Sequence, residues 1–405
     1  MSATEGSATL RWPASGDKFR LLLTILLTLA ALYGIAYLAV AAARGWPDGF
    51  GDSFALWSWG RFVAEYNAAA IYDPEKLRPA QLALGMDPGA SYPFGYPPSA
   101  LLLLWLLAQL PGWLSFLALM GLSLPLYLWA TLGRAWRPAA LAAALAAPAT
   151  AITIVSGQSG FLAAALLAGG LRLAAKKPLA AGVLFGLLSY KPQLGLLVPV
   201  ALVAAGLRRT LAAAAATALL LAVATGLGFG FAAWPAWITS IPAVSRQFAA
   251  ESSEIVHLMP TVLAASLQLG AAPAAAQAAQ GVVTAAAAAL VWVLYRAGPG
   301  PLAAAGLLCA ALLATPYAFV YDMPVVTTAV VWLVIEEQRA GDAFGTGEVV
   351  VLILAMLSPM ALASGHSVFP IAPLSLVLLL GVIARRSWQR RPQPAPLARP
   401  LPARG

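Results

Sequence analysis

The run LLLTILLTLAALYGIAYLAVAAA, residues 21–43, decides the class of fold. An α-helix needs about 20 apolar residues to cross the hydrocarbon core of a bilayer, and this run has 23. It is also longer than the roughly 7–15 apolar residues of a cleaved signal peptide. We therefore expect an uncleaved membrane-spanning helix near the start of the sequence.

The overall composition indicates many more such helices. The 405 residues are 61% hydrophobic and 10% charged, and the mean hydropathy is +0.82, so several further apolar runs can each supply a crossing. The net charge is +9, but Lys and Arg stand in ones, twos and threes at the ends of apolar runs. That placement is typical of membrane topology and not of a nucleic-acid surface. With Cys309 as the single cysteine, no internal disulfide can form.

The positive-inside rule orients the chain. With the N-terminus in the cytoplasm, residues 44–98 form a first outer loop and residues 232–258 a second. This path places 18 of the 24 Lys and Arg residues inside and five outside, and it leaves Lys191 unexplained. We predict an all-α polytopic membrane protein of about 11–13 transmembrane helices. These helices form one domain, residues 1–385, followed by a basic, Pro-rich cytoplasmic tail, residues 386–405.

Polar residues concentrate in the first outer loop. Residues 53–67 predict an amphipathic helix that lies on the membrane surface, with Phe54, Trp57 and Phe62 towards lipid, and residues 74–84 predict a second. Six of the fifteen carboxylates of the chain fall in this loop, namely Asp48, Asp52, Glu65, Asp73, Glu75 and Asp87. The loop is the expected working face of an integral membrane enzyme.

Three later turns are polar as well, and the predicted path puts them on the same side as the first loop. They are Gly157-Gln158-Ser159-Gly160, Tyr190-Lys191-Pro192 and the turn from Tyr317 to Asp322. A purely structural bundle has little reason to gather all its polar turns at one face. We therefore predict one shared site at the outer face.

Asp52 and Lys191 are the leading candidates for chemistry. A carboxylate at Asp52 can act as general base for an acceptor hydroxyl or orient it; the alternatives are an N-cap for the helix that follows and Asp48 in its place. An ionisable residue at membrane depth is functional by default. The Lys191 cation can stabilise a departing lipid-linked phosphate, or it can reach outward to headgroups.

Other candidates have weaker patterns. Asp322, with Tyr317 and Tyr321, can pair with Lys191, bind sugar hydroxyls or cap its helix. Gln158, between two glycines, can hydrogen-bond sugar or phosphate, or it belongs to a tight turn.

Three residues of the outer loops complete the candidate substrate-binding set. Tyr72 and Tyr96 can stack on sugar or belong to an interfacial aromatic belt, and His257 can bind substrate or be an interfacial polar residue. The two histidines lack zinc-ligand spacing, and the glycines at 226–230 lack a βαβ context. We expect neither a metal nor a cofactor.

Several motifs together carry a family resemblance. The pieces Ile71-Tyr72-Asp73, Tyr96-Pro97-Pro98, Gly157-Gln158-Ser159-Gly160, Lys191-Pro192 and Pro316-Tyr317 to Asp322 follow Asp52-Ser-Phe-Ala-Leu-Trp-Ser-Trp-Gly-Arg-Phe in a fixed order. This ordered set resembles glycosyltransferase family 87, which includes polyprenyl-phosphate-mannose-dependent mannosyltransferases of the GT-C type. The family usually has Asn where this chain has Ser159, which weakens the inference for Gln158.

The resemblance implies a GT-C fold and a function in the cell envelope. It implies transfer of a mannose-like hexose from a polyprenyl-phosphate sugar to a glycolipid or glycan acceptor at the extracytoplasmic face, with Asp52 as the catalytic carboxylate. It places the chain in the inner (plasma) membrane, with both termini cytoplasmic. A transporter or flippase of a lipid-linked sugar is the alternative, but it predicts internal repeats that the sequence does not show. A non-catalytic scaffold leaves Lys191 without a role.

Overall fold

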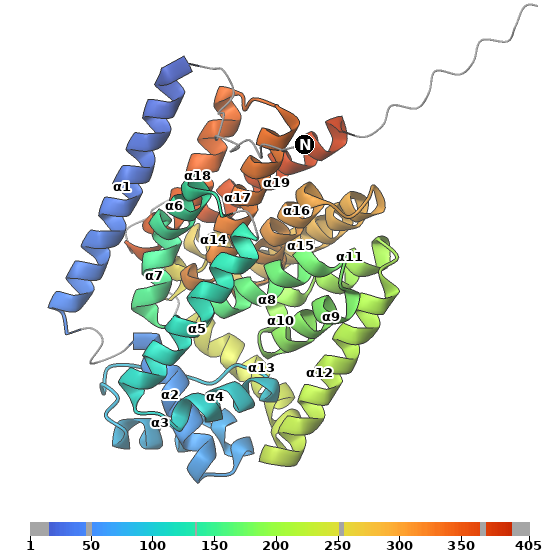
Figure 1. The fold of residues 1–405 in the computed structure, drawn as a ribbon. Coiled ribbons are helices and arrows are strands. Elements are labelled where there is room, and N and C mark those ends of the chain that lie inside the picture. Colours follow the sequence, from blue (N-terminus) through green and yellow to red (C-terminus); the bar gives the residue numbers. More distant parts are fainter. Residues whose placement is uncertain (1–15, 46–50, 134–135, 251–254, 365–369, 391–405) are drawn as a thin grey trace, which may run out of the picture.

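The computed structural model describes residues 16–45, 51–133, 136–250, 255–364 and 370–390. Within these ranges the chain consists of α-helices joined by turns and short 3-10 helices, and it contains no strand (Figure 1). The prediction of an all-α protein is confirmed. The connections include α14 (Val262–Gln268) and the 3-10 helices η1 (Ala68–Tyr72), η2 (Pro98–Ala100), η3 (Leu188–Tyr190), η4 (Val256–Leu258) and η5 (Val320–Asp322).

Six helices in the described part of the chain are long and apolar enough to cross a bilayer. They are α1 (Gly16–Ala43), α5 (Gly112–Leu132), α12 (Arg208–Phe229), α15 (Pro273–Arg296), α18 (Thr346–Ala363) and α19 (Ile371–Gln389). A seventh span results if α6 (Pro138–Ala146) and α7 (Pro148–Ser156) count as one; the two are bent by 51°, where Pro148 cannot continue the hydrogen-bond ladder. The prediction of a polytopic membrane protein is confirmed.

Shorter helices make up much of the rest of the bundle. They are α8 (Gly160–Leu173), α9 (Pro178–Leu187), α10 (Pro192–Gly195), α11 (Val198–Ala204), α16 (Pro301–Ala314) and α17 (Pro324–Ala340). Nearly every side chain of α16 is buried, and α8 and α17 are buried over most of their lengths. A helix too short to span lipid alone is tolerated where other helices cover its ends. In contrast, α9 and α11 each expose apolar side chains on one face, among them Leu179, Val183 and Val203.

The first outer loop folds onto the bundle as a compact helical layer. Its helices α2 (Gly51–Glu65) and α3 (Pro74–Ala83) gather at the lower end in Figure 1, together with α4 (Leu101–Ala108), which follows the loop, and α13 (Ala233–Ala250).

One face of α2 is covered by α4, which changes the predicted exposure of its aromatic residues. A Cβ at Gly60 would lie 2.1 Å from the Leu104 carbonyl oxygen, so the two backbones are in close contact. Phe62 is 2% exposed, and Trp57 Nε1 donates to the Leu110 carbonyl oxygen at 3.0 Å. The prediction that Phe62 faces lipid is wrong, because this face of α2 packs against protein.

Glycines also set the contact between α9 and α12. A Cβ at Gly182 would lie 2.3 Å from Ala213 Cβ, and one at Gly186 would lie 2.4 Å from Thr217 Cβ. Small residues let membrane helices approach closely where apolar burial alone gives no driving force. The pair Gly182 and Gly186, one helical turn apart, therefore determines how tightly α12 docks.

We expect Gly186→Leu to destabilise the protein by about 1–3 kcal/mol or more, because the added side chain overlaps Thr217 and the backbone of α12. Thermal unfolding in detergent, followed by size-exclusion chromatography, measures the loss. Gly121→Leu is the matched control, since Gly121 lies inside a spanning helix and has open space around it. Equal melting temperatures for the two variants would contradict the packing argument.

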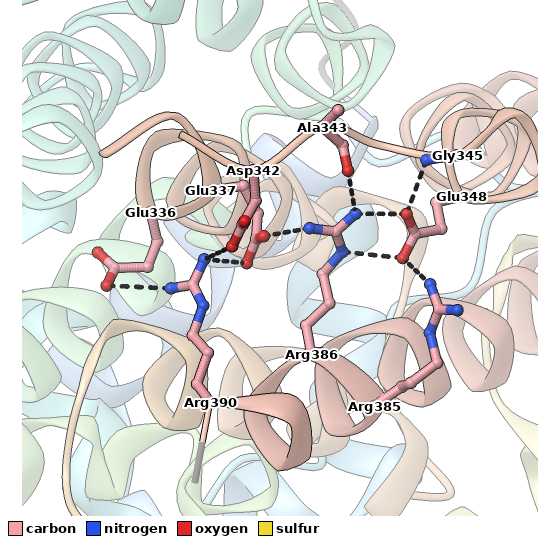
Figure 2. Close-up of polar contacts among 9 residues, drawn as sticks. All are labelled: Glu336, Glu337, Asp342, Ala343, Gly345, Glu348, Arg385, Arg386 and Arg390. Atoms are coloured by element: carbon pink, nitrogen blue, oxygen red, sulfur yellow. Dashed lines mark hydrogen bonds and ion pairs between the residues drawn. The ribbon is translucent and has the colours of Figure 1, made fainter. Parts of the chain in front are cut away.

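A network of ion pairs lies at the end of α17 that is distant from Asp322. Arg386 of α19 lies between Glu337 of α17 and Glu348 of α18 and pairs with both (Figure 2). Both Arg386 and Glu337 are buried, and removal of one partner from a buried pair is costly. The rest of the network comprises Glu336, Asp342, Arg385 and Arg390. These arginines pin α19 to α17 and α18, and α19 continues to Gln389, past the predicted start of the tail.

Candidate active site

Lys191 and Asp322 form a buried ion pair between two turns that lie 131 residues apart in the sequence. Lys191 Nζ is 2.5 Å from Asp322 Oδ1, and the two residues are 1% and 0% exposed. Asp322 Oδ2 accepts a hydrogen bond from the Phe319 backbone N–H at 3.2 Å. Lys191 Nζ also lies 4.9 Å from the centre of the Tyr321 ring, a favourable position for a cation. The ammonium is thus held by a carboxylate and an aromatic face.

Asp52 faces the same ion pair from the first turn of α2. Its carboxyl is half-buried, and burial raises its pKa from 3.8 to about 6, although the nearby Lys191 ammonium opposes this rise. This effect of Lys191 on Asp52 requires the two side chains to lie near each other, since charge interactions fade with distance. A carboxyl with this pKa is mostly ionised at neutral pH and is a stronger base than an ordinary aspartate.

Tyr96 lies near both acidic residues, Asp52 and Asp322. Burial, together with the carboxylates of Asp322 and Asp52, raises the pKa of Tyr96 well above its usual range. The Tyr96 hydroxyl therefore remains protonated and can donate a hydrogen bond. We call Asp52, Tyr96, Lys191, Tyr321 and Asp322 the Lys191 cluster.

Two glycines explain why the polar turn after α7 reaches this cluster. Gly157 has φ +62°, and a Cβ there would lie 2.5 Å from Ser53 Cβ. A Cβ at Gly160 would lie 1.7 Å from the Tyr321 carbonyl oxygen. A side chain at either position would displace the start of α2 or the η5 turn. The Gly-x-x-Gly pattern therefore permits the close contact that brings the turns of Asp52 and Asp322 together.

Gln158 and Ser159, between these glycines, are buried next to the cluster. The Tyr190 hydroxyl donates to the Ser159 carbonyl oxygen at 3.1 Å. The Tyr96 hydroxyl lies near the Ser159 hydroxyl, but in the described part of the chain no group meets hydrogen-bond geometry with Ser159 Oγ. A buried hydroxyl without a partner is unusual. Ser159 and Tyr190 are site residues that sequence reasoning missed, although both stand inside the quoted turns.

The other predicted residues lie around this cluster. The Tyr72 hydroxyl donates to the Tyr96 carbonyl oxygen at 2.9 Å, so Tyr72 supports the loop that carries Tyr96. Tyr317 packs in a second cluster with Val256 of the second outer loop and with Met259, the residue that follows it. His257 lines a small pocket of about 10 Å³ beside this second cluster.

Asp48, the alternative base, lies outside the described residues. Within the described ranges, no three His, Cys, Asp or Glu side chains are grouped so as to hold a metal ion.

The fold and this site define a polytopic membrane protein with a buried cluster of acidic and basic side chains. The model of glycosyltransferase family 87 matches residues 94–316, more than half of the chain, so the chain belongs to glycosyltransferase family 87. No curated protein and no solved structure matches it significantly. The match includes Tyr96 and Lys191, whereas Asp52 and Asp322 lie outside it. The protein is therefore a membrane glycosyltransferase, as the resemblance implied.

Proposed function

We propose that this glycosyltransferase moves a mannose-like hexose from a polyprenyl-phosphate sugar to a hydroxyl of a glycolipid or glycan acceptor. The supporting observation is the placement of Asp52 beside buried Lys191. A polyprenyl-phosphate sugar carries its own leaving group. The enzyme then needs a base for the attacking hydroxyl and a cation for the departing phosphate, and these two residues are of the required types.

Asp52 is the proposed base. Its carboxylate takes the proton of the acceptor hydroxyl while the hydroxyl oxygen bonds to the anomeric carbon. The bond from this carbon to the phosphate oxygen breaks, and its electron pair leaves with the phosphate. In-line attack inverts the anomeric centre.

Lys191 is the proposed partner of the phosphate. An ammonium has three N–H donors; one faces Asp322, which leaves donors for a phosphate oxygen. Asp322 pairs with Lys191 and orients it in a buried position, where an unpaired cation would be costly. The Tyr96 and Ser159 hydroxyls are further donors for sugar or phosphate oxygens.

The extracytoplasmic face is the proposed side of transfer, in the inner (plasma) membrane with both termini cytoplasmic. This orientation is supported by the excess of Lys and Arg in the turns opposite the first outer loop. The first outer loop, with α2 and α3, then lies outside the cell membrane, where envelope acceptors are present.

The pH dependence of transfer tests the proposal. In proteoliposomes with labelled polyprenyl-phosphate mannose and an envelope glycolipid extract, we expect kcat/KM to rise tenfold per pH unit below pH about 6 and to level off above it. The deprotonated carboxylate is the active form, and burial moves its titration upward from 3.8 to about 6. Asp87→Asn, at an exposed carboxylate of the same loop, should keep this profile. If the enzyme transferred sugar from a nucleotide sugar but not from polyprenyl-phosphate mannose, the proposed donor would be wrong.

A further inference from the structure

An apolar cavity lies between α1, α6, α17 and α18, and no residue of the Lys191 cluster lines it. Its volume is about 130 Å³, and its walls are almost entirely aliphatic, including Ala30 of α1, Ala143 of α6, Val331 of α17 and Leu352 of α18. An apolar cavity of about 150 Å³ remains free of water and accepts apolar guests. Most side chains of α1 are exposed, so the hydrocarbon of the bilayer surrounds this part of the molecule. The guest that the surroundings supply is an acyl chain.

Polar groups replace the aliphatic lining at one end of the cavity. Arg137 and Gln338 both line it, and Arg137 Nη1 donates to Gln338 Oε1 at 3.3 Å. Gln338 Nε2 is buried and has no hydrogen-bond partner within the described ranges. In the described part of the chain, no carboxylate lies within ion-pair distance of Arg137. A cation and an amide donor are thus available at the end of an apolar groove.

We propose that this groove binds an anionic glycerophospholipid. A segment of one acyl chain occupies the space between α1 and the α17–α18 pair, and the phosphate lies at Arg137, whose fork of donors suits phosphate oxygens. Gln338 Nε2 supplies a further hydrogen bond. Under the positive-inside path Arg137 is at the inner leaflet, and exposed Trp136 beside it is typical of a membrane interface. The lipid fills the groove along α1, the helix that precedes α2 and Asp52.

Photolabelling of the full-length protein tests this site. The protein is reconstituted in phosphatidylcholine vesicles with a trace of phosphatidylglycerol or of phosphatidylcholine that carries a photoreactive acyl chain, and labelled peptides are mapped by mass spectrometry. We expect phosphatidylglycerol to label the groove residues of α6, α17 and α18 several-fold more than phosphatidylcholine. Arg137→Gln should lower this preference about fivefold, the effect of one cationic side chain at a membrane surface. Arg296→Gln, at an exposed arginine of α15, should leave it unchanged.

A second pair of variants separates the groove from the general lipid surface. Ala143→Phe fills the cavity and should abolish labelling there, whereas Ala142→Phe, on the exposed side of the same helix, should not. Equal labelling by the two lipids, or an unchanged preference in Arg137→Gln, overturns the proposal. So does displacement of the label by an added polyprenyl phosphate but not by unlabelled phosphatidylglycerol. The readout is lipid binding, so it does not depend on the proposed transfer reaction.

Discussion

Asp52→Asn is expected to lower kcat for sugar transfer by about 10²–10⁴-fold, the usual contribution of a general base. The amide has nearly the shape of the carboxylate but cannot accept the proton of the acceptor hydroxyl. Because burial raises the pKa of the Asp52 carboxyl, its neutral replacement removes no favourable burial of charge. We therefore expect the melting temperature to stay the same or to rise slightly. Turnover in proteoliposomes and thermal unfolding are the two measurements.

The matched control for this variant is Asp73→Asn. Asp73 belongs to the same loop, but its carboxylate accepts a hydrogen bond from the Glu75 N–H at the start of α3. Asparagine keeps an oxygen that accepts this hydrogen bond and caps a helix about as well as aspartate, so both the melting temperature and transfer should change little. Near-normal turnover by Asp52→Asn would remove Asp52 from the mechanism and make Asp48 the next candidate.

Lys191→Met is expected to reduce transfer by about 10²–10³-fold and to destabilise the protein. The first effect follows from the loss of a fixed charge near the departing phosphate. The second follows because the buried Asp322 carboxylate loses its partner, which typically costs about 3–5 kcal/mol. The two effects must be separated before the phosphate role is accepted.

The double variant Lys191→Met with Asp322→Asn separates them. Neither position then carries a buried charge, so the melting temperature should recover most of the loss. Transfer and donor affinity should remain low, because the cation is still missing. If the double variant regains activity together with stability, Lys191 is a structural residue and the phosphate role is rejected. Donor affinity is measured by competition between labelled and unlabelled polyprenyl-phosphate mannose.

The sequence indicated much of this site in advance. When the Lys and Arg residues between the apolar runs are assigned to the inner or outer side, Lys191 is the one that the predicted topology does not explain. The same topology predicts that the Asp52 loop and the Asp322 turn lie on the same side of the membrane as the Lys191 turn. That inference needed only the hydrophobicity of each run and the alternation of crossings. It did not require knowledge of which helices touch.

The structure shows contacts of Phe62, Tyr72 and Tyr317 that the sequence did not predict. Phe62 is buried because α4 covers α2, and an amphipathic pattern cannot distinguish a lipid-facing helix from one covered by protein. Tyr72 supports the Tyr96 loop through a backbone carbonyl, and Tyr317 packs with the second outer loop. These contacts join segments far apart in the chain, and no local pattern specifies them.

The sequence alone determined that this protein is a polytopic helical membrane protein with its polar turns on one side, because spanning runs and topogenic charges are local properties. Only the tertiary structure decided that Lys191 pairs with Asp322 and lies beside Asp52. It also showed why the turn at 157–160 carries glycines, which permit contacts that any Cβ would block. Pairing of this kind depends on how closely helices pack, and that distance is set by the shapes of side chains on several helices at once.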